Sequence, residues 1–458
     1  MAGPRLLFYG DDFTGSTDAL EVLSLAGLRA ALFLQAPDAA MLDRHPGLDA
    51  IGVAGDSRTM TPQEMATRFA PELPAMAAAG APLVHYKVCS TFDSAPDVGS
   101  IGRVLELARP FFNGAVAVVA ATPHLGRHCL YGNLFARSGT DGQVHRIDRH
   151  PIMSVHPVTP MREADLLRHI GQQTGLPIGL VTLDTVRAGA DAMRERFDAL
   201  QRDGFAAVLI DGYDSDDLRA AGQLLDGLGS ANSPAFVVGG SGVEHALTLA
   251  WGLPRDAGVI PSVRPTTDGA PLLAVSGSAS ALSAMQIETA VQAGFEEVAL
   301  DAARLAGERD WRAELDRAGE QAAAALHAGR SVIVHSARGP ADPRVAAARQ
   351  ALAAAGGDSA QRSDGGAQLI ANRIGMLVRQ VVHVAKPPRI VISGGDTSSS
   401  VARALDVQAV EVAARLAPGA PLCRVLESSV VRGCEIAFKG GQMGSRDFIR
   451  EARDGFAA

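Results

Sequence analysis

The fold is decided first by Arg389-Ile-Val-Ile-Ser-Gly-Gly-Asp-Thr-Ser-Ser-Ser-Val-Ala-Arg-Ala-Leu405, in which an apolar, β-branched run leads through paired glycines and hydroxyls into an amphipathic stretch. This order predicts a strand, a tight turn and a helix. Gly394 and Gly395 let the backbone turn sharply and approach a ligand, and the hydroxyls that follow lie near the N–H groups of a helix N-terminus, which attract anions. The turn therefore predicts a phosphate site. The alternative is an ordinary connection capped by Asp396 or Thr397.

The same order of strand, polar turn and helix occurs near the N-terminus, in Arg5-Leu-Leu-Phe-Tyr-Gly-Asp-Asp-Phe-Thr-Gly-Ser-Thr-Asp-Ala-Leu20. Open α/β sheets bind ligands at the carboxyl ends of their strands, where Asp11 and Asp12 are expected. Adjacent residues after a strand point different ways, so we expect Asp12 to face a ligand and the other aspartate to cap a helix that starts near Thr14. The alternative is that both carboxylates only cap and solvate the helix start.

Short apolar runs alternate with longer amphipathic segments along most of the chain. The runs lie at residues 115–121, 178–183, 206–210 and 235–238, and again at 271–276, 331–335 and 389–393. Strands that alternate with helices predict parallel sheets covered on both faces. A segment rich in proline and glycine, 252–271, separates the two groups. We therefore predict an α/β protein with an N-terminal domain at 1–251, a linker at 252–271, a C-terminal domain at 272–458 and a ligand cleft between the domains.

The composition is that of an ordinary folded protein. The 458 residues exceed what one hydrophobic core usually supports, and 47% are hydrophobic and 20% charged. The net charge of −8, without a basic tract, gives no general attraction to nucleic acid. The four cysteines form no CxxC pair, so neither a zinc site nor a disulfide framework is predicted, and reduced thiols suggest the cytoplasm. We find neither a leader peptide nor an apolar stretch long enough to span a membrane.

Two further segments of the first domain carry groups that suit a small acid. In His85-Tyr-Lys-Val-Cys-Ser-Thr-Phe-Asp-Ser94, a lysine and hydroxyls follow a short strand. Lys87 could neutralise a carboxylate, and Ser90 and Thr91 could hydrogen-bond to it. Arg58 follows another short strand and could bind a carboxylate through two parallel hydrogen bonds. The alternatives are a solvated lysine in a Ser-Thr turn and a lone surface arginine.

Two more glycine-containing turns follow predicted strands in the second domain. Val275-Ser-Gly-Ser-Ala-Ser280 ends a strand and begins a helix, and Ala437-Phe-Lys-Gly-Gly-Gln-Met-Gly444 supplies Lys439 and three glycines. Together with the turn at Gly394, they predict one polyanionic ligand, for which a nucleotide is the simplest candidate. The chain has no GxxxxGK[ST] loop, and no GxGxxG follows the first strand of either domain, so a P-loop enzyme is not predicted. The alternative for each turn is ordinary chain connection.

The sequence resembles the four-carbon acid sugar kinase family, which includes erythronate, threonate and 3-oxo-tetronate kinases and a 3-oxo-isoapionate kinase. The resemblance rests on Gly10-Asp-Asp-Phe-Thr-Gly15, Ser393-Gly-Gly-Asp-Thr-Ser398 and Lys439-Gly-Gly-Gln-Met-Gly444, and it extends over nearly the whole chain. The combination in this order is specific. It implies an N-terminal acid-sugar domain, a C-terminal ATP domain and phosphoryl transfer across the cleft.

The resemblance also implies roles for individual residues. The sugar acid would be bound beside Asp12 by Arg58, Lys87, Cys89, Ser90, Thr91 and Phe92. ATP would be bound by Ser276, Ser278, Ser280, Gly394, Gly395, Asp396, Thr397, Gly440, Gly441 and Gly444.

One stretch departs from the family pattern. Many members carry Lys-x-Asp-Ser-Thr-Leu-Arg-Gly, whereas this chain has Lys87-Val-Cys-Ser-Thr-Phe-Asp-Ser94. Cys89 replaces an acid and Asp93 replaces a base. The departure leaves room for a substrate other than erythronate or threonate.

We therefore hypothesise an ATP-dependent kinase. A hydroxyl of a small sugar acid or oxo-sugar acid would attack the γ-phosphate of ATP, with Asp12 or Asp11 orienting it or accepting its proton. Mg²⁺ would bridge the phosphates and contact Asp396 directly or through water. The linker at 252–271 would act as a hinge that closes the cleft. The expected partners are the sugar acid and ATP, in a cytoplasmic enzyme and in a homodimer.

Two alternatives belong to other functional classes. The first is a non-catalytic sensor of a nucleotide or a sugar acid on the same two domains, which the changes at Cys89 and Asp93 suggest. The second, ranked last, is a dehydrogenase, because the chain lacks the dinucleotide-binding fingerprint.

Overall fold

The computed structural model describes residues 3–139, 142–156, 158–254, 256–354 and 359–456. The chain divides into two compact units, Met1–Val259 and Ile260–Ala458. The boundary lies within the segment predicted as the linker, of which Arg255 lies outside the described residues. The hinge role of that segment stays a prediction.

The N-terminal unit is built on a parallel sheet. Its strands follow the order β2 (Ala30–Phe33), β3 (Ala50–Ala54), β1 (Leu6–Gly10), β4 (Leu83–Lys87), β11 (Ala235–Gly239), β5 (Val116–Val119), β10 (Ala207–Ile210) and β9 (Ile178–Val181). Each neighbouring pair is parallel. A small antiparallel sheet is added by β6 (Arg127–Leu130), β7 (Asn133–Arg137) and β8 (Val144–Arg146).

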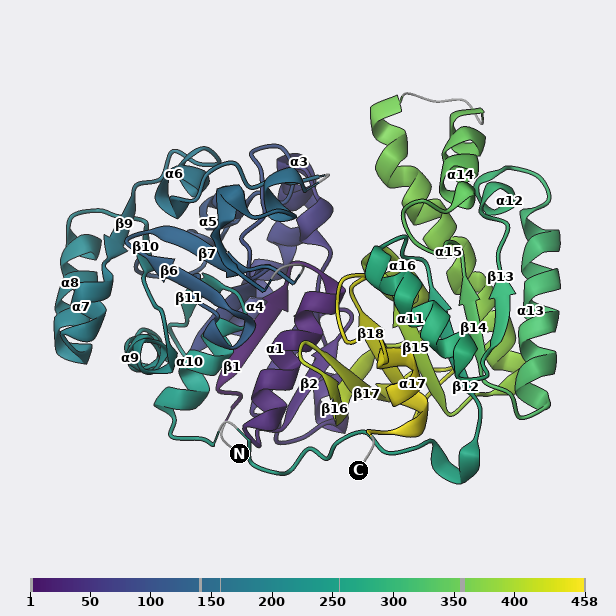
Figure 1. The fold of residues 1–458 in the computed structure, drawn as a ribbon. Coiled ribbons are helices and arrows are strands. Elements are labelled where there is room, and N and C mark those ends of the chain that lie inside the picture. Colours follow the sequence, from purple (N-terminus) through teal and green to yellow (C-terminus); the bar gives the residue numbers. More distant parts are fainter. Residues whose placement is uncertain (1–2, 140–141, 157, 255, 355–358, 457–458) are drawn as a thin grey trace. The chain divides into compact units, whose positions relative to one another are not determined.

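Helices connect these strands and flank the sheet (Figure 1). They are α1 (Phe13–Leu25), α2 (Ala39–Arg44), α3 (Pro62–Glu64), α4 (Leu73–Ala78), α5 (Ile101–Ala108), α6 (Leu166–Gly171), α7 (Leu183–Arg187), α8 (Ala190–Arg202), α9 (Ser215–Asp226) and α10 (Gly242–Ala250). Because both faces of the sheet are covered, strands such as β4 are buried along their whole length.

The C-terminal unit has a mixed sheet. Its strands follow the order β13 (Glu296–Ala299), β14 (Val332–His335), β12 (Leu272–Ser276), β15 (Arg389–Ser393), β18 (Glu435–Lys439), β17 (Ala420–Glu427) and β16 (Ala409–Ala417). Pairing is parallel from β13 to β18 and antiparallel from β18 to β16. Its helices are α11 (Ala281–Gln292), α12 (Ala302–Ala306), α13 (Trp311–His327), α14 (Pro343–Ala354), α15 (Ser359–Ala385), α16 (Gly395–Ala404) and α17 (Phe448–Asp454).

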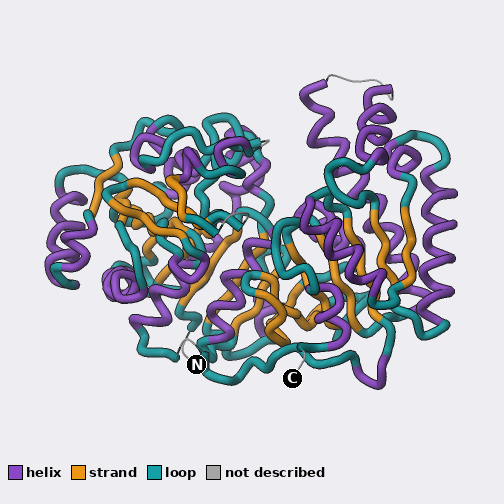
Figure 2. Tube along the Cα trace, in the orientation of Figure 1, coloured by secondary structure: helices purple, strands orange, loops and turns teal. Residues whose placement is uncertain are grey.

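The predicted fold class is confirmed, because strands and helices alternate along each unit and the strands pair mostly in parallel (Figure 2). The apolar runs singled out in the sequence form buried strands, with Val391 and Ile392 entirely inaccessible to solvent in β15. Burial of such β-branched side chains drives the assembly of the sheet, at about 25 cal/mol for each Å² of apolar surface removed from water.

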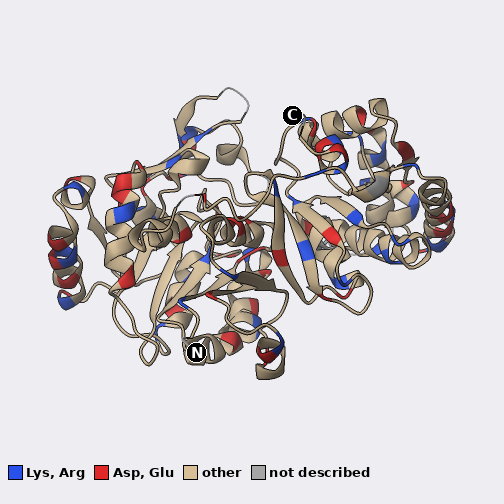
Figure 3. Cartoon of the chain, turned by 90° about the horizontal axis from the view of Figure 1, so that it is seen from below, with Lys and Arg blue, Asp and Glu red and all other residues tan. Residues whose placement is uncertain are grey.

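Charged residues of both signs are interspersed along the outer helices of each unit (Figure 3). This pattern is typical of solvated helix faces rather than of one basic stripe. The absence of a nucleic-acid partner stays a prediction. None of the helices in the described ranges combines the length and the apolar character that a membrane crossing requires.

A fully buried hydrogen-bonded pair, His85 and Glu244, fixes β4 to α10. Nδ1 of His85 lies 2.6 Å from Oε1 of Glu244, and Nε2 of the same ring lies 3.1 Å from the carbonyl oxygen of Gly239. Both side chains are inaccessible to solvent. The pair therefore sets the position of the turn in which β11 ends and α10 begins.

We expect Glu244→Ala to lower the free energy of unfolding of the N-terminal unit by about 3–5 kcal/mol, because it leaves His85 buried without its partner. Urea denaturation followed by circular dichroism measures this change. Glu195→Ala, on the exposed face of α8, is the control and should change the free energy by less than about 0.5 kcal/mol. Equal unfolding midpoints for the two variants would show that the buried pair contributes nothing.

Candidate functional site

The predicted acid-binding residues meet at one edge of the N-terminal sheet. Gly10 at the end of β1 is in register with Ala54 of β3 and Lys87 of β4. The turns that follow these strands therefore lie side by side, because neighbouring parallel strands end at the same edge. They carry the Asp-Asp pair, Arg58 and the segment 89–94.

Arg58 is held by both aspartates of the first turn. Its Nε and Nη2 donate to the two carboxylate oxygens of Asp11 at 3.1 and 2.7 Å, and its Nη1 donates to Oδ2 of Asp12 at 3.0 Å. The predicted two-bond clamp thus exists, but the carboxylate that it binds is Asp11. The side chain of Asp11 is 7% exposed, whereas those of Asp12 and Arg58 are each 24% exposed and can meet a ligand.

The aspartate that caps the first helix is Asp12, which corrects the expectation that it would only face the ligand. Its Oδ1 accepts from the amide of Gly15 at 2.8 Å, and α1 begins at Phe13 rather than near Thr14. Burial raises the pKa of Asp12, but the charges of Arg58 and Lys87 outweigh burial, so its pKa lies below the ordinary value. Asp12 is therefore a carboxylate at neutral pH, and its helix cap fixes its direction.

The pKa of Asp11 is shifted the opposite way. Burial raises the pKa of its carboxyl above the ordinary value, against the opposing charge of Arg58. Since both oxygens of Asp11 already accept from Arg58, its place is behind the arginine rather than in the site.

Lys87 ends β4 as a nearly buried ammonium group. Its Nζ lies 3.8 Å from Oδ2 of Asp18, and its side chain is 3% exposed. Burial lowers the pKa of Lys87, but Asp18 and Asp12 outweigh burial, so the pKa lies above its ordinary value and the charge persists. A Cβ at Gly15 would lie 2.3 Å from Oδ1 of Asp12 and 2.8 Å from Nζ of Lys87, which explains the glycine between them.

The segment after β4 forms a hydrogen-bonded chain. Sγ of Cys89 lies 2.9 Å from Oγ1 of Thr91, which donates to Oδ1 of Asp93 at 2.5 Å. Burial raises the pKa of Cys89 to about 11, so the thiol stays protonated at neutral pH. The two departures from the family pattern are thus joined through Thr91.

Phe92 and Ser90 of the same segment have different surroundings. Phe92 adopts a positive φ of 54°, and its side chain is packed in the hydrophobic core, which points to a packing role rather than the predicted substrate contact. Oγ of Ser90 instead accepts from Nε of Arg127 at 3.1 Å.

Arg127, which follows the turn after β5, also reaches this edge. One feature of the edge was missed in the sequence. It is the turn Gly239-Gly240-Ser241-Gly242 at the end of β11, where a Cβ on Gly240 would lie 3.2 Å from Cα of Ser90 and 3.0 Å from Oγ1 of Thr122. The turn could have been found, because a strand that leads into glycines and serine is the pattern recognised at Gly394.

The three predicted phosphate turns of the C-terminal unit are neighbours. Ser276, Ser393 and Lys439 end β12, β15 and β18 in register. The amide of Gly277 donates to the carbonyl of Ser393 at 3.0 Å, and that of Gly394 donates to the carbonyl of Lys439 at 2.9 Å. The backbone therefore links each turn to the next.

These turns touch so closely that their glycines are required. A Cβ on Gly277 would lie 2.0 Å from Oγ1 of Thr397, and one on Gly441 would lie 2.2 Å from Oγ of Ser278. Gly394 has a φ of 115°, which side chains rarely adopt. The alternative cap by Asp396 or Thr397 is not observed, since the N-cap residue of α16 is Gly394 and no side chain caps the helix. Its N-terminal amides suit an anion.

The remaining predicted residues of these turns differ in accessibility. Ser280 caps α11, and its Oγ also donates to the carbonyl of Gly441 at 2.6 Å. Oγ of Ser276 is buried and has no partner among the described residues. A Cβ on Gly444 would lie 2.5 Å from Phe448, whereas Gly440 borders only Met443 and Gly395 faces open space. Gly395 and Gly440 are thus the glycines that leave room beside the turns.

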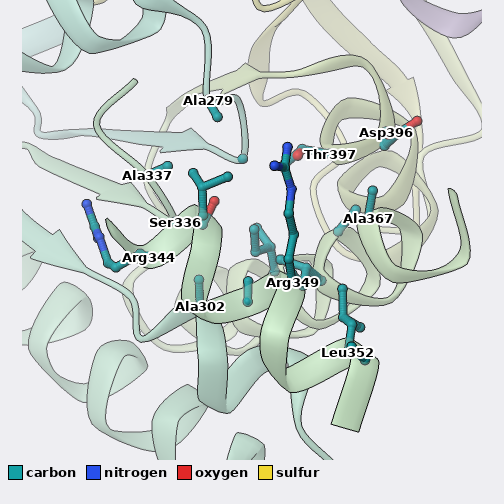
Figure 4. Close-up of a pocket in the computed structure, with 17 residues that line it drawn as sticks. Ala279, Ala302, Ser336, Ala337, Arg344, Arg349, Leu352, Ala367, Asp396 and Thr397 are labelled. Carbon is teal, nitrogen blue, oxygen red and sulfur yellow. The ribbon is translucent and has the colours of Figure 1, made fainter. Parts of the chain in front are cut away.

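A pocket of about 500 Å³ adjoins these turns (Figure 4). Gly277, Asp396 and Thr397 form its polar end. Its apolar wall comes from α14 and α15 and includes Ala348, Leu352, Ile370, Ala371 and Ile374. The volume lies in the ordinary range for small-molecule sites. An apolar wall with glycine turns at one end can hold a ring and an attached polyanion.

Two arginines of α14 line the pocket with different partners. Arg344 donates to Asp342 at 2.7 Å and to the carbonyl of Leu300 at 3.3 Å, so it is fixed within the protein. Arg349 also lines the pocket, and its side chain extends into it in the view of Figure 4. Arg349 was not predicted from the sequence, because it lies in a helix without a motif.

Lys439 lies beneath the turns rather than in the pocket. Its Nζ donates to Oγ of Ser393 at 2.8 Å, and its side chain is inaccessible to solvent. Burial lowers the pKa of Lys439 to about 7. It therefore brings a titratable positive charge below the anion-binding turns.

No group of three or more histidine, cysteine, aspartate or glutamate residues that could hold a metal ion occurs in the described part of the chain. Asp396 is exposed in the first turn of α16, at the polar end of the pocket. This donor set fits a cation that also binds phosphate oxygens and water, as Mg²⁺ does, and not a site made of protein groups alone.

Comparisons with known proteins match both units. The family model described as a sugar-binding N-terminal domain matches residues 6–247, and that described as a nucleotide-binding C-terminal domain matches residues 273–449. A 3-oxo-isoapionate kinase of Paraburkholderia graminis is 40% identical, covering 99% of this chain and 95% of that protein. A 3-oxo-tetronate kinase of Methylobacterium radiotolerans is 33% identical over 97% of each chain.

Solved structures share the fold. A Haemophilus influenzae protein has a TM-score of 0.71 at 23% identity, covering 98% of this chain and 100% of that one.

We expect stability to depend on pH through Lys439. Its pKa is about 7 in the folded protein and near the ordinary 10.5 when unfolded, so between these values the unfolded chain binds one more proton. The native protein and Lys439→Met should then differ in how their free energies of unfolding depend on pH. The free energy of the native protein minus that of the variant should rise by about 1.4 kcal/mol per pH unit between pH 8 and 10. Below pH 7 the slope vanishes.

Urea denaturation across this pH range measures the difference. Lys386→Met, which changes an exposed lysine, is the control and should give no slope below pH 10. A difference for Lys439→Met that does not change with pH would contradict the prediction.

Proposed function

Because the chain belongs to the four-carbon acid sugar kinase family, we propose that it is an ATP-dependent kinase that phosphorylates a hydroxyl of a small oxo-sugar acid. The N-terminal unit would bind the acid and the C-terminal unit the nucleotide, in keeping with the descriptions of the two family models. The relative at 40% identity supports 3-oxo-isoapionate or an acid of the same class as the substrate. None of the four cysteines forms a disulfide in the described part of the chain, which fits a reducing compartment such as the cytoplasm.

The observation that carries the proposal is the meeting of three glycine turns beside an apolar pocket. The triphosphate would lie against Gly277 and the turn at Gly394, where α16 begins without a side-chain cap. The adenine ring would enter between α14 and α15. Arg349 lines the same pocket as Gly277 and Thr397, so its guanidinium would be available to a phosphate bound there (Figure 4).

In the N-terminal unit, Asp12 would receive the reacting hydroxyl. Its helix cap and its bond to Arg58 fix the carboxylate, and its lowered pKa keeps the carboxylate ionised. An ionised, oriented oxygen can accept a hydrogen bond from the hydroxyl and then its proton as the bond to phosphorus forms. Such weak bases suffice, because phosphoryl transfer depends mostly on positioning and charge neutralisation.

Mg²⁺ is expected to accompany ATP. Asp396 would contact it, directly or through water, and phosphate oxygens and waters would supply the remaining ligands. The ion would neutralise charge on the phosphates as the transfer proceeds. Closure of the two units about the segment 252–271 stays part of the proposal and would exclude water from the transfer.

We expect the purified protein to release ADP from Mg-ATP when 3-oxo-isoapionate or 3-oxo-tetronate is added, and Asp12→Asn to lower kcat at least 100-fold while the affinity for ATP changes less than threefold. A coupled ADP assay and calorimetry measure the two effects, with Asp191→Asn on exposed α8 as the control. If no acid of a tetronate and oxo-acid panel gives ADP although both ligands bind, the chain is a sensor. Unchanged turnover would remove Asp12 from the mechanism.

Gly277→Ala should weaken Mg-ATP binding at least tenfold, because its Cβ would lie 2.0 Å from Oγ1 of Thr397 and displace that side chain from the phosphate turn. Isothermal titration calorimetry measures the affinity. Gly171→Ala, where nothing lies within 4 Å of the added Cβ, provides the matched control and should bind as the native protein does. Equal affinities for the two variants would place the phosphates elsewhere.

A further inference from the structure

Three cations gather at the acid-binding edge, and they differ in how they are neutralised. Arg58 is paired with Asp11 and Asp12, and Lys87 lies 3.8 Å from Asp18. Arg127 forms no ion pair with any residue that the structure describes. Aspartates of the protein therefore balance the charges of Arg58 and Lys87, but no ion pair in the described ranges balances that of Arg127.

Arg127 is held rigidly although it has no acidic partner. The amides of Thr122 and Arg127 donate to each other's carbonyl oxygens at 3.0 and 3.1 Å, which closes the turn between them. Gly126 completes this turn with a φ of 72°. The guanidinium is then fixed by Nε, which donates to Ser90 at 3.1 Å, and by Nη1, which donates to the carbonyl of Leu125. Nη2 donates to nothing in the described ranges and is available to a ligand.

The direction of the side chain places its free end over the site. Arg127 follows β5 and Ser90 follows β4, and β11 lies between these two strands in the sheet. The guanidinium therefore reaches across the end of β11, where the turn at Gly240 carries no side chain to obstruct it. Lys87 ends β4, which is the neighbour of β1, and Asp12 follows β1, so Lys87 lies between Asp12 at the β1 side of the edge and Arg127 at the β5 side.

A partly buried arginine without an anion is costly. Burial lowers the pKa of Arg127 below its ordinary value, which is the sign of a charge that the protein desolvates without compensating. A ligand carboxylate would restore the balance and would accept a charge-assisted hydrogen bond from Nη2 of the fixed guanidinium.

We propose that Arg127, oriented by Ser90, is the residue that recognises the carboxylate of the substrate and thereby selects acids over neutral sugars. This inference rests on the proposed function. It assigns the two ends of the substrate: the carboxylate lies at the β5 side of the edge, and the reacting hydroxyl lies at the β1 side, beside Asp12. Arg58 then serves to hold the two aspartates rather than the substrate carboxylate.

The test compares 3-oxo-tetronate with erythrulose, which has a hydroxymethyl group in place of the carboxylate. In Arg127→Met, kcat/KM for the acid should fall about 100-fold through KM, while kcat/KM for erythrulose and KM for ATP change less than threefold. Arg127→Lys should restore part of the loss, and Arg202→Met on exposed α8 should behave as the native protein. Parallel losses for both substrates, or a KM for the acid within threefold of the native value, would overturn the inference.

A binding measurement separates this inference from the proposed function. If the native protein releases no ADP with any acid, the proposed function fails. Calorimetry with 3-oxo-tetronate alone then decides the role of Arg127. Binding by the native protein that Arg127→Met weakens at least 30-fold supports the inference, whereas equal binding, or no binding by the native protein, overturns it.

Discussion

In-register pairing of parallel strands is the constraint on which both units depend. It brings turns that are far apart in sequence to one edge of each sheet, as with Gly10, Ala54 and Lys87 in one unit and Ser276, Ser393 and Lys439 in the other. The backbone bonds that continue beyond the strands, such as that from Gly394 to Lys439, keep the turns in fixed relative positions. A ligand site at this edge then needs only suitable groups on those turns, because open α/β sheets bind ligands at the carboxyl ends of their strands.

The two sites differ in the groups that each places at the edge of its own sheet. The C-terminal turns are made mainly of glycine and hydroxyl residues, with Lys439 buried below them, so backbone amides and one hidden charge prepare a surface for phosphates. The N-terminal edge relies on charged side chains that hold one another. Asp11 fixes Arg58, Arg58 fixes Asp12, and the helix cap at Gly15 completes the arrangement. Such preorganisation lowers the cost of binding and orienting a small acid.

Local patterns predicted the strands, the turns and the two-unit α/β architecture, because strand, glycine turn and helix follow one another in sequence. What the sequence could not predict was which groups pair. Arg58 binds Asp11 across 47 residues, and Arg127 reaches Ser90 across 37, and neither choice follows from spacing. Phe92 belongs to a motif that suggests ligand binding, yet its side chain is packed in the core. Arg349 lines the pocket beside the glycine turns from a helix that carries no motif.

The central claim is that the glycine turns of the C-terminal unit hold the triphosphate of ATP while the edge at Asp12 holds a small acid. A crystal structure with a non-hydrolysable ATP analogue, Mg²⁺ and 3-oxo-tetronate tests it most directly. The account predicts phosphates against the turn at Gly277 and the amide of Gly395, and the acid between Arg127 and Asp12. Nucleotide density away from these turns, or an acid bound elsewhere, would contradict it.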